Sequence, residues 1–271
     1  MFAVMFCRAG ILATAAALAL TAAGCAKSGG STTASGVKLV NPGQLTTCTS
    51  LPYAPFQSKE ASGKVVGFDV DMVDLVAKKL KVSQKIVDTP FNGIKSGQDL
   101  KTGKCDIAAA GMSITPERQQ AMDFSAPYFD VTQAMLVKEG APYKTLADLK
   151  NKRVGAQAGT TGLDYVRRNA AQGGYEVVDY PDLGAEYQAL ATGQVDAAVN
   201  DLPVWNDYLK KSPGKFVIAA QFNTGEKYGF ALKKGGNPEL LKMVNDTIAQ
   251  AREDGTYAKL HLKWMGTAPR Q

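Results

Sequence analysis

The sequence is poor in histidine: its 271 residues contain one, His261. One histidine cannot supply a cluster of imidazole ligands, so we expect no metal site of that kind. His261 also lies in an amphipathic stretch typical of a surface helix rather than of a catalytic triad. No Gly-Lys-Ser or Gly-Lys-Thr closes a phosphate loop. The net charge of +6 comes from scattered residues without a run of one sign. We therefore expect no bound metal, no cofactor and no nucleic-acid partner.

A long hydrophobic segment is also lacking. The apolar run 9–23 follows a short n-region with one positive charge. The run is too short for a comfortable membrane span and is typical of a secretory signal. It ends in Thr21-Ala22-Ala23-Gly24-Cys25, which resembles the lipobox of bacterial lipoproteins, although Ala22 stands where Leu is usual. We expect a signal peptide over 1–25, lipidation of Cys25 and a Ser/Gly/Thr-rich flexible tether over 26–36. The alternative is an ordinary signal peptide with a chance cysteine.

Cysteine is scarce too, with four residues. Cys7 would leave with the signal and Cys25 would carry lipid, so Cys48 and Cys105 remain. An exported chain meets an oxidising compartment, which permits a disulfide between these two. The sequence alone leaves that pairing open.

From Leu45 onward, short apolar runs alternate with helical periods. This alternation predicts an α/β fold with largely parallel sheets. Strands are expected at 45–49, 65–66, 85–88, 105–110, 131–138, 153–157, 176–179 and 195–199. Helices are expected at 69–81, 93–101, 162–172 and 184–192, with two more over 237–264.

The chain repeats itself once. Residues 100–111 align with 190–201 at a constant offset of 90, and Leu, Thr, Gly, Asp and Ala recur. Both segments have the pattern of a helix end, a glycine turn and a strand, as two similar lobes would produce. Gly111 and Asp201 then follow equivalent strands, at the edge where open α/β sheets bind ligands.

Polar groups suited to a small ligand follow these strands. Thr115-Pro116 predicts a helix start that brings Arg118 to the sheet edge, where its guanidinium can hold a carboxylate. A surface ion pair of Arg118 with Glu117 or Asp123 is the alternative. The segment 155–165 leads from a strand into a helix, whose first N–H groups can bind an anion beside Thr161. The helix start at 155–165 could equally be a plain N-cap with no ligand.

A carboxylate and aromatic rings complete the set. Asp201 suits an ammonium group, and Tyr53, Phe56 and Phe91 follow predicted strands, where they either cover a ligand or cap the core. Together these groups match the zwitterion of an α-amino acid.

The chain resembles a known family in several motifs. These are Tyr53-Ala54-Pro55-Phe56, Val66-Gly67-Phe68-Asp69-Val70-Asp71, Gly111-Met112-Ser113-Ile114-Thr115-Pro116-Glu117-Arg118, Met122-Asp123-Phe124-Ser125-Ala126-Pro127-Tyr128 and Asp254-Gly255-Thr256-Tyr257. From about residue 45 to 266 the chain is similar to bacterial solute-binding proteins for polar amino acids, such as the glutamine-, histidine- and lysine/arginine/ornithine-binding proteins of ABC importers.

The resemblance implies a periplasmic-binding-protein type II fold, in which two α/β lobes are joined by two hinge strands. Lobe 1 would be 37–128 plus 229–271 and lobe 2 would be 132–225, with hinges near 128–132 and 224–228. It also implies a monomer on the outer face of the cell membrane that hands its amino acid to an ABC permease.

The resemblance assigns roles at the site. Arg118 would bind the ligand α-carboxylate with the Ser113 and Thr161 amides. Gly111, Ser113 and Asp201 would hold the α-ammonium group. Tyr53 and Phe91 would enclose the ligand side chain.

Two departures bear on specificity. Ser50 stands where many members carry Asp, which weakens the case for lysine or arginine, and Gln157 stands where glutamine binders often carry Lys. We therefore expect an uncharged polar ligand. The family picture makes the Cys48 and Cys105 strands neighbours, but strands that end level would place the Cα atoms beyond the roughly 7 Å that a disulfide tolerates.

Two other functions fit the same fold. A lyase resembling the periplasmic cyclohexadienyl dehydratases would need a general acid, for which Asp182 and Glu186 are candidates. A sensory receptor would differ only in its partner.

Overall fold

The computed structural model describes residues 31–269 of the chain. The predicted signal peptide 1–25, with Cys25, and most of the predicted tether lie outside these residues. Within residues 31–269, no helix is long and apolar enough to cross a membrane.

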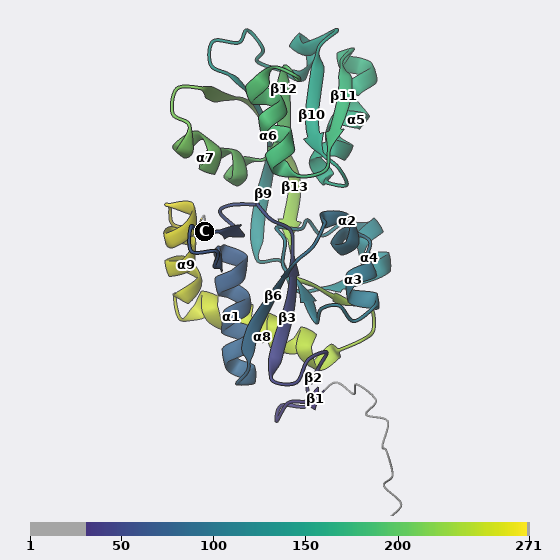
Figure 1. Ribbon diagram of the computed structural model, residues 1–271, viewed down its shortest axis with the longest axis vertical. Helices are drawn as coiled ribbons and strands as arrows, with labels where there is room; N and C mark the ends of the chain where they lie inside the picture. The colour runs from purple at the N-terminus through teal and green to yellow at the C-terminus, as the bar shows by residue number, and fades with distance from the viewer. Residues whose placement is uncertain (1–30, 270–271) are drawn as a thin grey trace, which may run out of the picture.

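Two five-stranded sheets form the body of the molecule (Figure 1). The first sheet, which we assign to lobe 1, has the order β6-β3-β7-β14-β8. Its strands are β3 (Gln44–Thr49), β6 (Ser83–Asp88), β7 (Ile107–Ala108), β8 (Met122–Phe124) and β14 (Ala231–Lys233). The second sheet, which we assign to lobe 2, has the order β11-β10-β12-β9-β13. Its strands are β9 (Phe129–Lys138), β10 (Arg153–Gln157), β11 (Glu176–Tyr180), β12 (Ala197–Asp201) and β13 (Phe216–Tyr228).

Helices cover both sheets. Those packed on the first sheet are α1 (Phe68–Leu80), α2 (Phe91–Lys95), α3 (Gln98–Lys101) and α4 (Pro116–Ala121). The helices α8 (Pro238–Glu253) and α9 (Thr256–Met265) pack against α1 and against each other. Those packed on the second sheet are α5 (Thr161–Gly173), α6 (Leu183–Thr192) and α7 (Leu202–Lys211), beside the 3-10 turn Leu146–Leu149. Two small hairpins pair β1 (Ser31–Thr32) with β2 (Lys38–Leu39) and β4 (Ser58–Lys59) with β5 (Val65–Val66).

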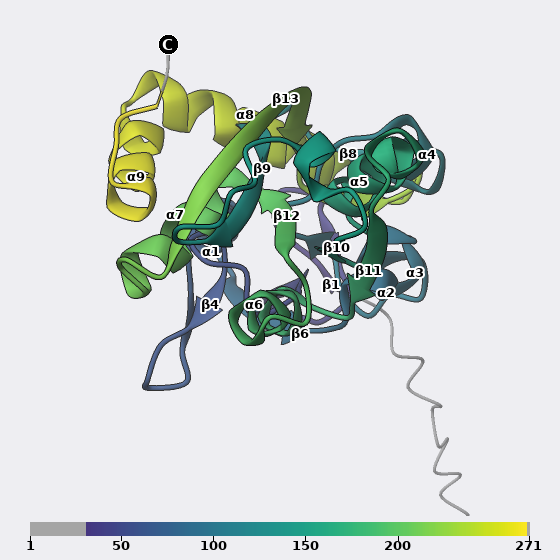
Figure 2. The same cartoon turned by 90° about the horizontal axis from the view of Figure 1, so that it is seen from above.

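The strands β9 and β13 carry the chain between the two sheets. They pair antiparallel along most of their length and lie side by side in both views (Figures 1 and 2). At their lower ends, the Tyr128 amide donates to the Tyr228 carbonyl, and Ser113 of lobe 1 bridges to Tyr228. The backbone of β13 is therefore tied to the cleft edge of lobe 1.

Three sequence expectations differ from the structure. The sheets are not largely parallel, because two strand pairs in each sheet are parallel and two are antiparallel. The antiparallel partners are the returning strands β9, β13 and β14, whose direction the alternation of strands and helices does not reveal. The helix expected at 93–101 is two helices, since Gly97 has a left-handed backbone (φ 73°) between them. The tether expected to reach Gly36 is already paired at Ser31–Thr32.

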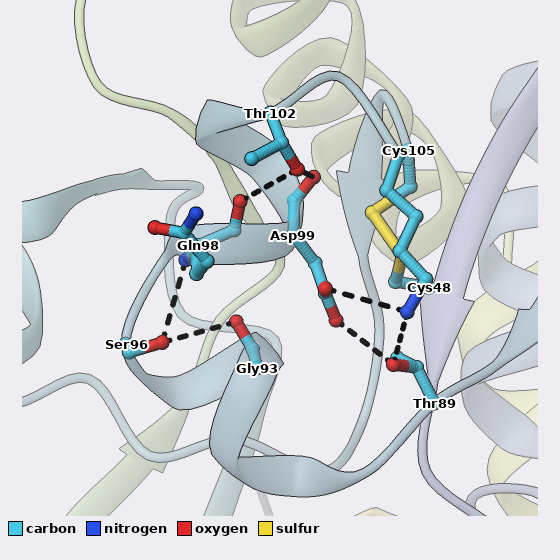
Figure 3. Close-up of polar contacts among 9 residues, drawn as sticks. Cys48, Thr89, Gly93, Ser96, Gln98, Asp99, Thr102 and Cys105 are labelled. Atoms are coloured by element: carbon cyan, nitrogen blue, oxygen red, sulfur yellow. Dashed lines mark hydrogen bonds and ion pairs between the residues drawn. A yellow bond between two sulfur atoms is a disulfide. The ribbon is translucent and has the colours of Figure 1, made fainter.

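A disulfide joins Cys48 to Cys105, with 5.7 Å between their Cα atoms (Figure 3). The strands β3 and β7 end within one residue of each other, with Cys48 opposite Ala108. The strand expected at 105–110 begins only at Ile107, so Cys105 precedes it and is not held in the extended register that would place the Cα atoms too far apart. Beside the bridge, Asp99 of α3 accepts hydrogen bonds from the Thr89 hydroxyl at 3.0 Å and from the Lys104 ammonium group at 3.4 Å. Figure 3 shows these contacts next to the disulfide. They fix the segment that carries α2 and hence Phe91.

The internal repeat has a structural counterpart. Asp106 forms two hydrogen bonds with the backbone of Thr46. The Asp106 amide donates to the Thr46 carbonyl, and the Thr46 amide donates to the Asp106 carboxylate at 2.8 Å. Asp196 does the same with Arg153, whose amide donates to its carboxylate at 2.9 Å. Each aspartate thus anchors the start of the neighbouring parallel strand.

Candidate functional site

A cleft pocket lies at the carboxyl ends of the central strands and takes residues from both lobes. Its lining is Ser50, Leu51, Pro52, Tyr53, Phe91, Ala110, Gly111, Ser113, Arg118, Gln157, Thr160, Thr161, Asp182, Leu183 and Asp201. The structure thus brings all nine ligand-binding residues expected from the sequence together around one pocket. The parallel strands β3, β7, β10 and β12 end at this edge, which is where open α/β sheets place their sites.

Arg118 lies in the first turn of α4, as its Thr-Pro start predicts. The Thr115 side chain accepts a hydrogen bond from the Arg118 amide, and Pro116 occupies the first helical position. The guanidinium donates to the Ser113 carbonyl at 2.7 Å and to the Gly159 carbonyl of lobe 2 at 3.2 Å. The side chain is 8% exposed and lies 5.5 Å from the centre of the Phe91 ring. The surface ion pair considered from the sequence is not formed, since Asp123 pairs with Lys234.

Burial decides the electrostatics of this residue. Desolvation lowers the pKa of Arg118, while the nearby carboxylates of Glu226 and Asp164 act in the opposite direction. A guanidinium remains charged even when buried, so Arg118 presents a dehydrated positive charge to the pocket. Such a charge favours an anionic partner.

Two backbone amides lie near this charge. Thr161 is the first residue of α5, and the Thr160 side chain caps the helix by accepting from the Leu163 amide at 3.1 Å. Among the hydrogen bonds of the described residues, none is donated by the Ser113 or Thr161 amide. The Thr161 amide lies at a helix start, where an unpaired N–H group favours a carboxylate.

Asp201 is the negative counterpart on lobe 2. It follows β12 directly and is 5% exposed. Its carboxylate accepts from the hydroxyls of Tyr53 and Tyr228 and from the Gln133 amide group. Burial raises its pKa to about 6, while the hydrogen bonds from Tyr228 and Tyr53 oppose the rise. Asp201 is therefore a carboxylate that titrates close to neutral pH.

Gly111 gives the pocket backbone instead of a side chain. Its φ is +55°, and a Cβ atom there would meet the Tyr53 ring at 2.8 Å and the Tyr228 ring at 3.3 Å. Its amide donates at 2.8 Å to the buried carboxylate of Asp69. Glycine is thus required both by the backbone angle and by the rings packed against it.

The aromatic residues divide between site and core. Tyr53 and Phe91 line the pocket, and each is 7% exposed. Phe56 is fully buried and packs edge-on against Phe129, with 5.0 Å between ring centres. The sequence had left each aromatic open to either role, and Phe56 is a core residue.

Two polar acceptors, Gln157 and Asp182, also line the pocket. Gln157 is 4% exposed, and its Oε1 atom has no hydrogen-bond partner among the described residues. Asp182 lines the pocket and uses its Oδ1 atom to cap α6 through the Ala185 amide. Glu186, the other acid candidate, is fully buried and bonded to Asn200 rather than lining the pocket.

Sequence reasoning missed three polar residues on the crossing strands. Gln133 lies on β9, and Glu226 and Tyr228 lie on β13. Gln133 contacts both Asp201 and Thr161, and Glu226 accepts from the hydroxyls of Ser113 and Thr161. The alternation of half-buried Glu226, exposed Lys227 and buried Tyr228 could have indicated a strand with one face turned to the cleft.

The pocket contains about 420 Å³ of space not filled by atoms, part of which is open to solvent. No group of three or more potential metal ligands occurs within residues 31–269.

Comparisons with known proteins agree with this geometry. The sequence profile of the bacterial extracellular solute-binding proteins, family 3, matches residues 45–267. A probable histidine-binding protein of Neisseria gonorrhoeae is 33% identical over 255 residues, which cover 92% of this chain and 94% of that protein.

Solved structures are similar as well. An ancestral arginine-binding protein bound to arginine superposes with a TM-score of 0.77 at 40% identity, covering 82% of this chain and 98% of the other. The ancestral amino acid-binding protein AncCDT-1, a precursor of cyclohexadienyl dehydratase, gives a TM-score of 0.74 at 36% identity and covers 82% and 95% of the two chains. The chain therefore belongs to family 3 of the bacterial extracellular solute-binding proteins and has their two-lobed periplasmic-binding fold.

Proposed function

We propose that the protein captures a free polar L-amino acid between its lobes and delivers it to an ABC permease. The observation that carries this proposal is the pair of buried opposite charges, Arg118 on lobe 1 and Asp201 on lobe 2, that line one pocket. An α-amino acid zwitterion carries the complementary pair. In this proposal Arg118 and the Ser113 and Thr161 amides hold the carboxylate, while Gly111, Ser113 and Asp201 hold the ammonium group.

Ligand capture follows from the division of the site. Each lobe alone offers half of the groups, so a ligand gains all of its contacts only in the closed form. The hinges we propose lie near 128–132 and 224–228, where β9 and β13 pass between the sheets. The proposed lobe boundaries are those expected from the sequence, with lobe 1 beginning in the β1–β2 hairpin.

A thermal-shift screen of the common L-amino acids tests capture, because a ligand of the folded state raises the melting temperature. We expect at least one polar amino acid to raise it, and calorimetry then gives the affinity. The matched controls are the amide and the N-acetyl derivative of that amino acid, which lack one charge each. The proposal would be contradicted if both derivatives raised the melting temperature as much as the amino acid itself does, or if no amino acid raised it.

We further propose that the ligand side chain is polar and uncharged, because Ser50 supplies no charge and Gln157 offers a buried, unpaired acceptor. Asp182 is the wall residue that could instead favour a cation. Calorimetry with glutamine, histidine, lysine and arginine compares the two. If arginine or lysine bound most tightly and Asp182→Asn abolished that preference, the uncharged assignment would be wrong.

We propose that Cys25 carries the lipid that keeps the protein at the outer face of the membrane. Detergent phase partition of the protein expressed in a bacterial host tests this. Wild type should enter the detergent phase, and Cys25→Ser should remain in the aqueous phase or keep its signal peptide. If both proteins stayed aqueous after signal removal, the ordinary signal peptide would be correct.

Delivery is tested with the permease encoded for this ligand, reconstituted in vesicles. The loaded protein should stimulate ATP hydrolysis more than the ligand-free protein. We propose that it acts as a monomer, which sedimentation of the loaded protein checks. Stimulation of a signalling partner in place of a permease would favour the sensory receptor.

One observation keeps the lyase under test: Asp182 lines the pocket, and one structural relative is a dehydratase precursor. Incubation with prephenate and arogenate, followed by detection of the aromatic product, discriminates the two functions. We expect no turnover. Turnover that Asp182→Asn abolishes would overturn this expectation.

A further inference from the structure

Glu226 forms a bridge between the lobes that the proposed ligand contacts do not include. Its Oε2 atom accepts a hydrogen bond from the Ser113 hydroxyl of lobe 1 at 2.6 Å and another from the Thr161 hydroxyl of lobe 2 at 2.6 Å. Its Oε1 atom accepts from the Thr224 hydroxyl at 2.7 Å. A single carboxylate oxygen thus joins the two halves of the pocket.

The position of Glu226 explains how it reaches both lobes. It lies on β13, one of the two strands that pass between the sheets. The pairing of β13 with β9 shifts register between Phe222 and Glu226, and Gly225 has a positive φ of 69° there. Beyond this irregularity Lys227 is exposed, whereas Glu226 and Tyr228 share the opposite face of the strand, the one that meets the cleft residues Ser113 and Asp201.

The bridge leaves the Ser113 and Thr161 amides available to the ligand. Ser113 and Thr161 use their hydroxyls for Glu226, and no hydrogen bond among the described residues is donated by their amides. Tyr53 differs, because its hydroxyl occupies the Asp201 carboxylate that an ammonium group would need. The Tyr53 contact would compete with a ligand, whereas the Glu226 bridge can form with or without one.

The bridge is also connected to the other crossing strand. Gln133 of β9 donates to the Thr161 hydroxyl at 3.3 Å and to Asp201 at 2.5 Å. Hydrogen bonds therefore run from Ser113 through Glu226, Thr161 and Gln133 to Asp201. The two ends of the proposed zwitterion site are linked through side chains of both crossing strands.

We propose that Glu226 is a positioning residue that latches the cleft, so that it stabilises the closed form of the ligand-free protein and aligns the Ser113 and Thr161 amides. This inference deepens the proposed function and rests on it only for the role of the amides. Hydrogen bonds to a carboxylate are stronger than those between neutral groups. Because β13 is tied to lobe 1 beside Ser113, the bond from Thr161 of lobe 2 breaks when the lobes separate, so the latch sets the ratio of closed to open molecules.

The test measures that ratio in the absence of any amino acid. Two fluorophores are attached through ketone-bearing amino acids at exposed Gln98 of lobe 1 and exposed Arg168 of lobe 2, so that no cysteine is changed. Single-molecule energy transfer then reports closed and open populations. Glu226→Ala should lower the closed-to-open ratio by about tenfold, because it removes the charged acceptor that the Ser113 and Thr161 hydroxyls share.

Three variants separate the mechanisms. Glu226→Gln keeps an oxygen acceptor without the charge, so its closed-to-open ratio should lie between those of wild type and Glu226→Ala. Thr161→Val removes the lobe 2 donor and should lower the closed-to-open ratio as Glu226→Ala does. It also provides the test if Glu226→Ala does not fold. Gln221→Ala, at an exposed position of the same strand, is the matched control and should behave as wild type.

An unchanged ratio in folded Glu226→Ala or Thr161→Val would overturn the latch. A shift of Glu226→Gln as large as that of Glu226→Ala would assign the effect to charge and overturn the hydrogen-bonded latch. Melting temperatures of all variants establish that they are folded. Because no ligand is present, the latch can fail while amino-acid capture stands, and a failed ligand screen would leave the latch result intact.

Discussion

The two lobes share one repeated segment. In both copies an aspartate anchors the neighbouring strand, but the residues that follow the repeated strand differ. Asp106 and Asp196 each accept the amide of the first residues of the neighbouring parallel strand. The strands that follow these aspartates, β7 and β12, both run to the cleft. The two copies differ at that edge, because lobe 1 presents the backbone of Gly111 and lobe 2 presents the carboxylate of Asp201.

This difference teaches how a repeated scaffold comes to bind an asymmetric ligand. The aspartates that hold the strands together lie away from the pocket and recur in both lobes. The residues at the strand ends diverge, since the two ends of a zwitterion need opposite partners. Changes at the strand ends should therefore alter binding, and changes at the anchoring aspartates should alter stability.

The largest effect is expected from the positive side of the site. Arg118→Ala should weaken binding of the amino acid by about 3–5 kcal/mol, because the ligand carboxylate would be buried without its charged partner. The affinity of Arg118→Lys should lie between those of wild type and Arg118→Ala, since an ammonium group keeps the charge but cannot form the two parallel hydrogen bonds of a guanidinium group. Calorimetry measures both, with exposed Arg168→Ala as the control. Wild-type affinity in Arg118→Ala would remove this residue from the site.

The negative side should give a smaller loss with a dependence on pH. Asp201→Asn should cost about 3 kcal/mol of binding free energy. In wild type the affinity should fall as the pH drops from 7 to 5, because Asp201 has a pKa of about 6 and loses its charge. The variant should bind with little change over this range. Calorimetry at pH 5, 6 and 7 checks both, and an equal slope in the variant would exclude Asp201 as its source.

The stability of the ligand-free protein should show the opposite sign. The folded pKa of Asp201, about 6, lies above its ordinary value of 3.8. The folded state thus holds the proton more tightly than the unfolded state. This contribution to the unfolding free energy is complete below the ordinary value and is lost as the pH rises through 6. Denaturant unfolding of wild type and Asp201→Asn between pH 4 and 7 measures this contribution, which only the wild type should show.

The disulfide belongs to lobe 1 alone within the repeat, since Val195 occupies the place of Cys105. Cys48→Ala with Cys105→Val gives lobe 1 the residue that lobe 2 carries. The bridge closes a loop with a sequence separation of 57. Its removal should lower the unfolding free energy by about 2–4 kcal/mol. Reduction of wild type should give the same loss, and a stability insensitive to both would show that the bridge adds nothing.

The smallest effect separates the two anchoring aspartates. Asp106→Ala leaves the Val40 and Thr46 amides without their acceptor and should cost about 2–3 kcal/mol of stability. Asp196 has one such amide and a side chain that is 30% exposed, so water can replace it and Asp196→Ala should cost about 1 kcal/mol. Urea unfolding measures the two losses. Weaker amino-acid binding by folded Asp106→Ala would contradict the division between scaffold and site.

Much of the site could be predicted because its residues stand directly after strands or at helix starts. Arg118 was placed by the Thr-Pro signal of α4, and Asp201 by its alignment with Gly111 in the repeat. The chain needs only local rules to reach these positions. The family motifs then assigned their roles, which stay predictions until ligand binding is measured.

The crossing strands could not be predicted in the same way. Residues 216–228 form one long strand with an irregularity near Gly225, which interrupts the alternation that marks a strand. Glu226 and Gln133 meet Thr161 through contacts distant in sequence, and no local pattern reports such a meeting. The direction of the returning strands was missed for the same reason.

The position of β14 has a consequence for how the chain folds. This strand comes from residues 231–233 and lies between β7 and β8 of the first sheet. The second sheet contains only residues 129–228, so it can assemble while the end of the chain is still being synthesised or secreted. The first sheet must keep a gap until the last forty residues arrive. Lobe 1 therefore contains the first strands to be synthesised but is the last lobe to be completed. A chain that ended before β14 would leave the edges of β7 and β8 unpaired.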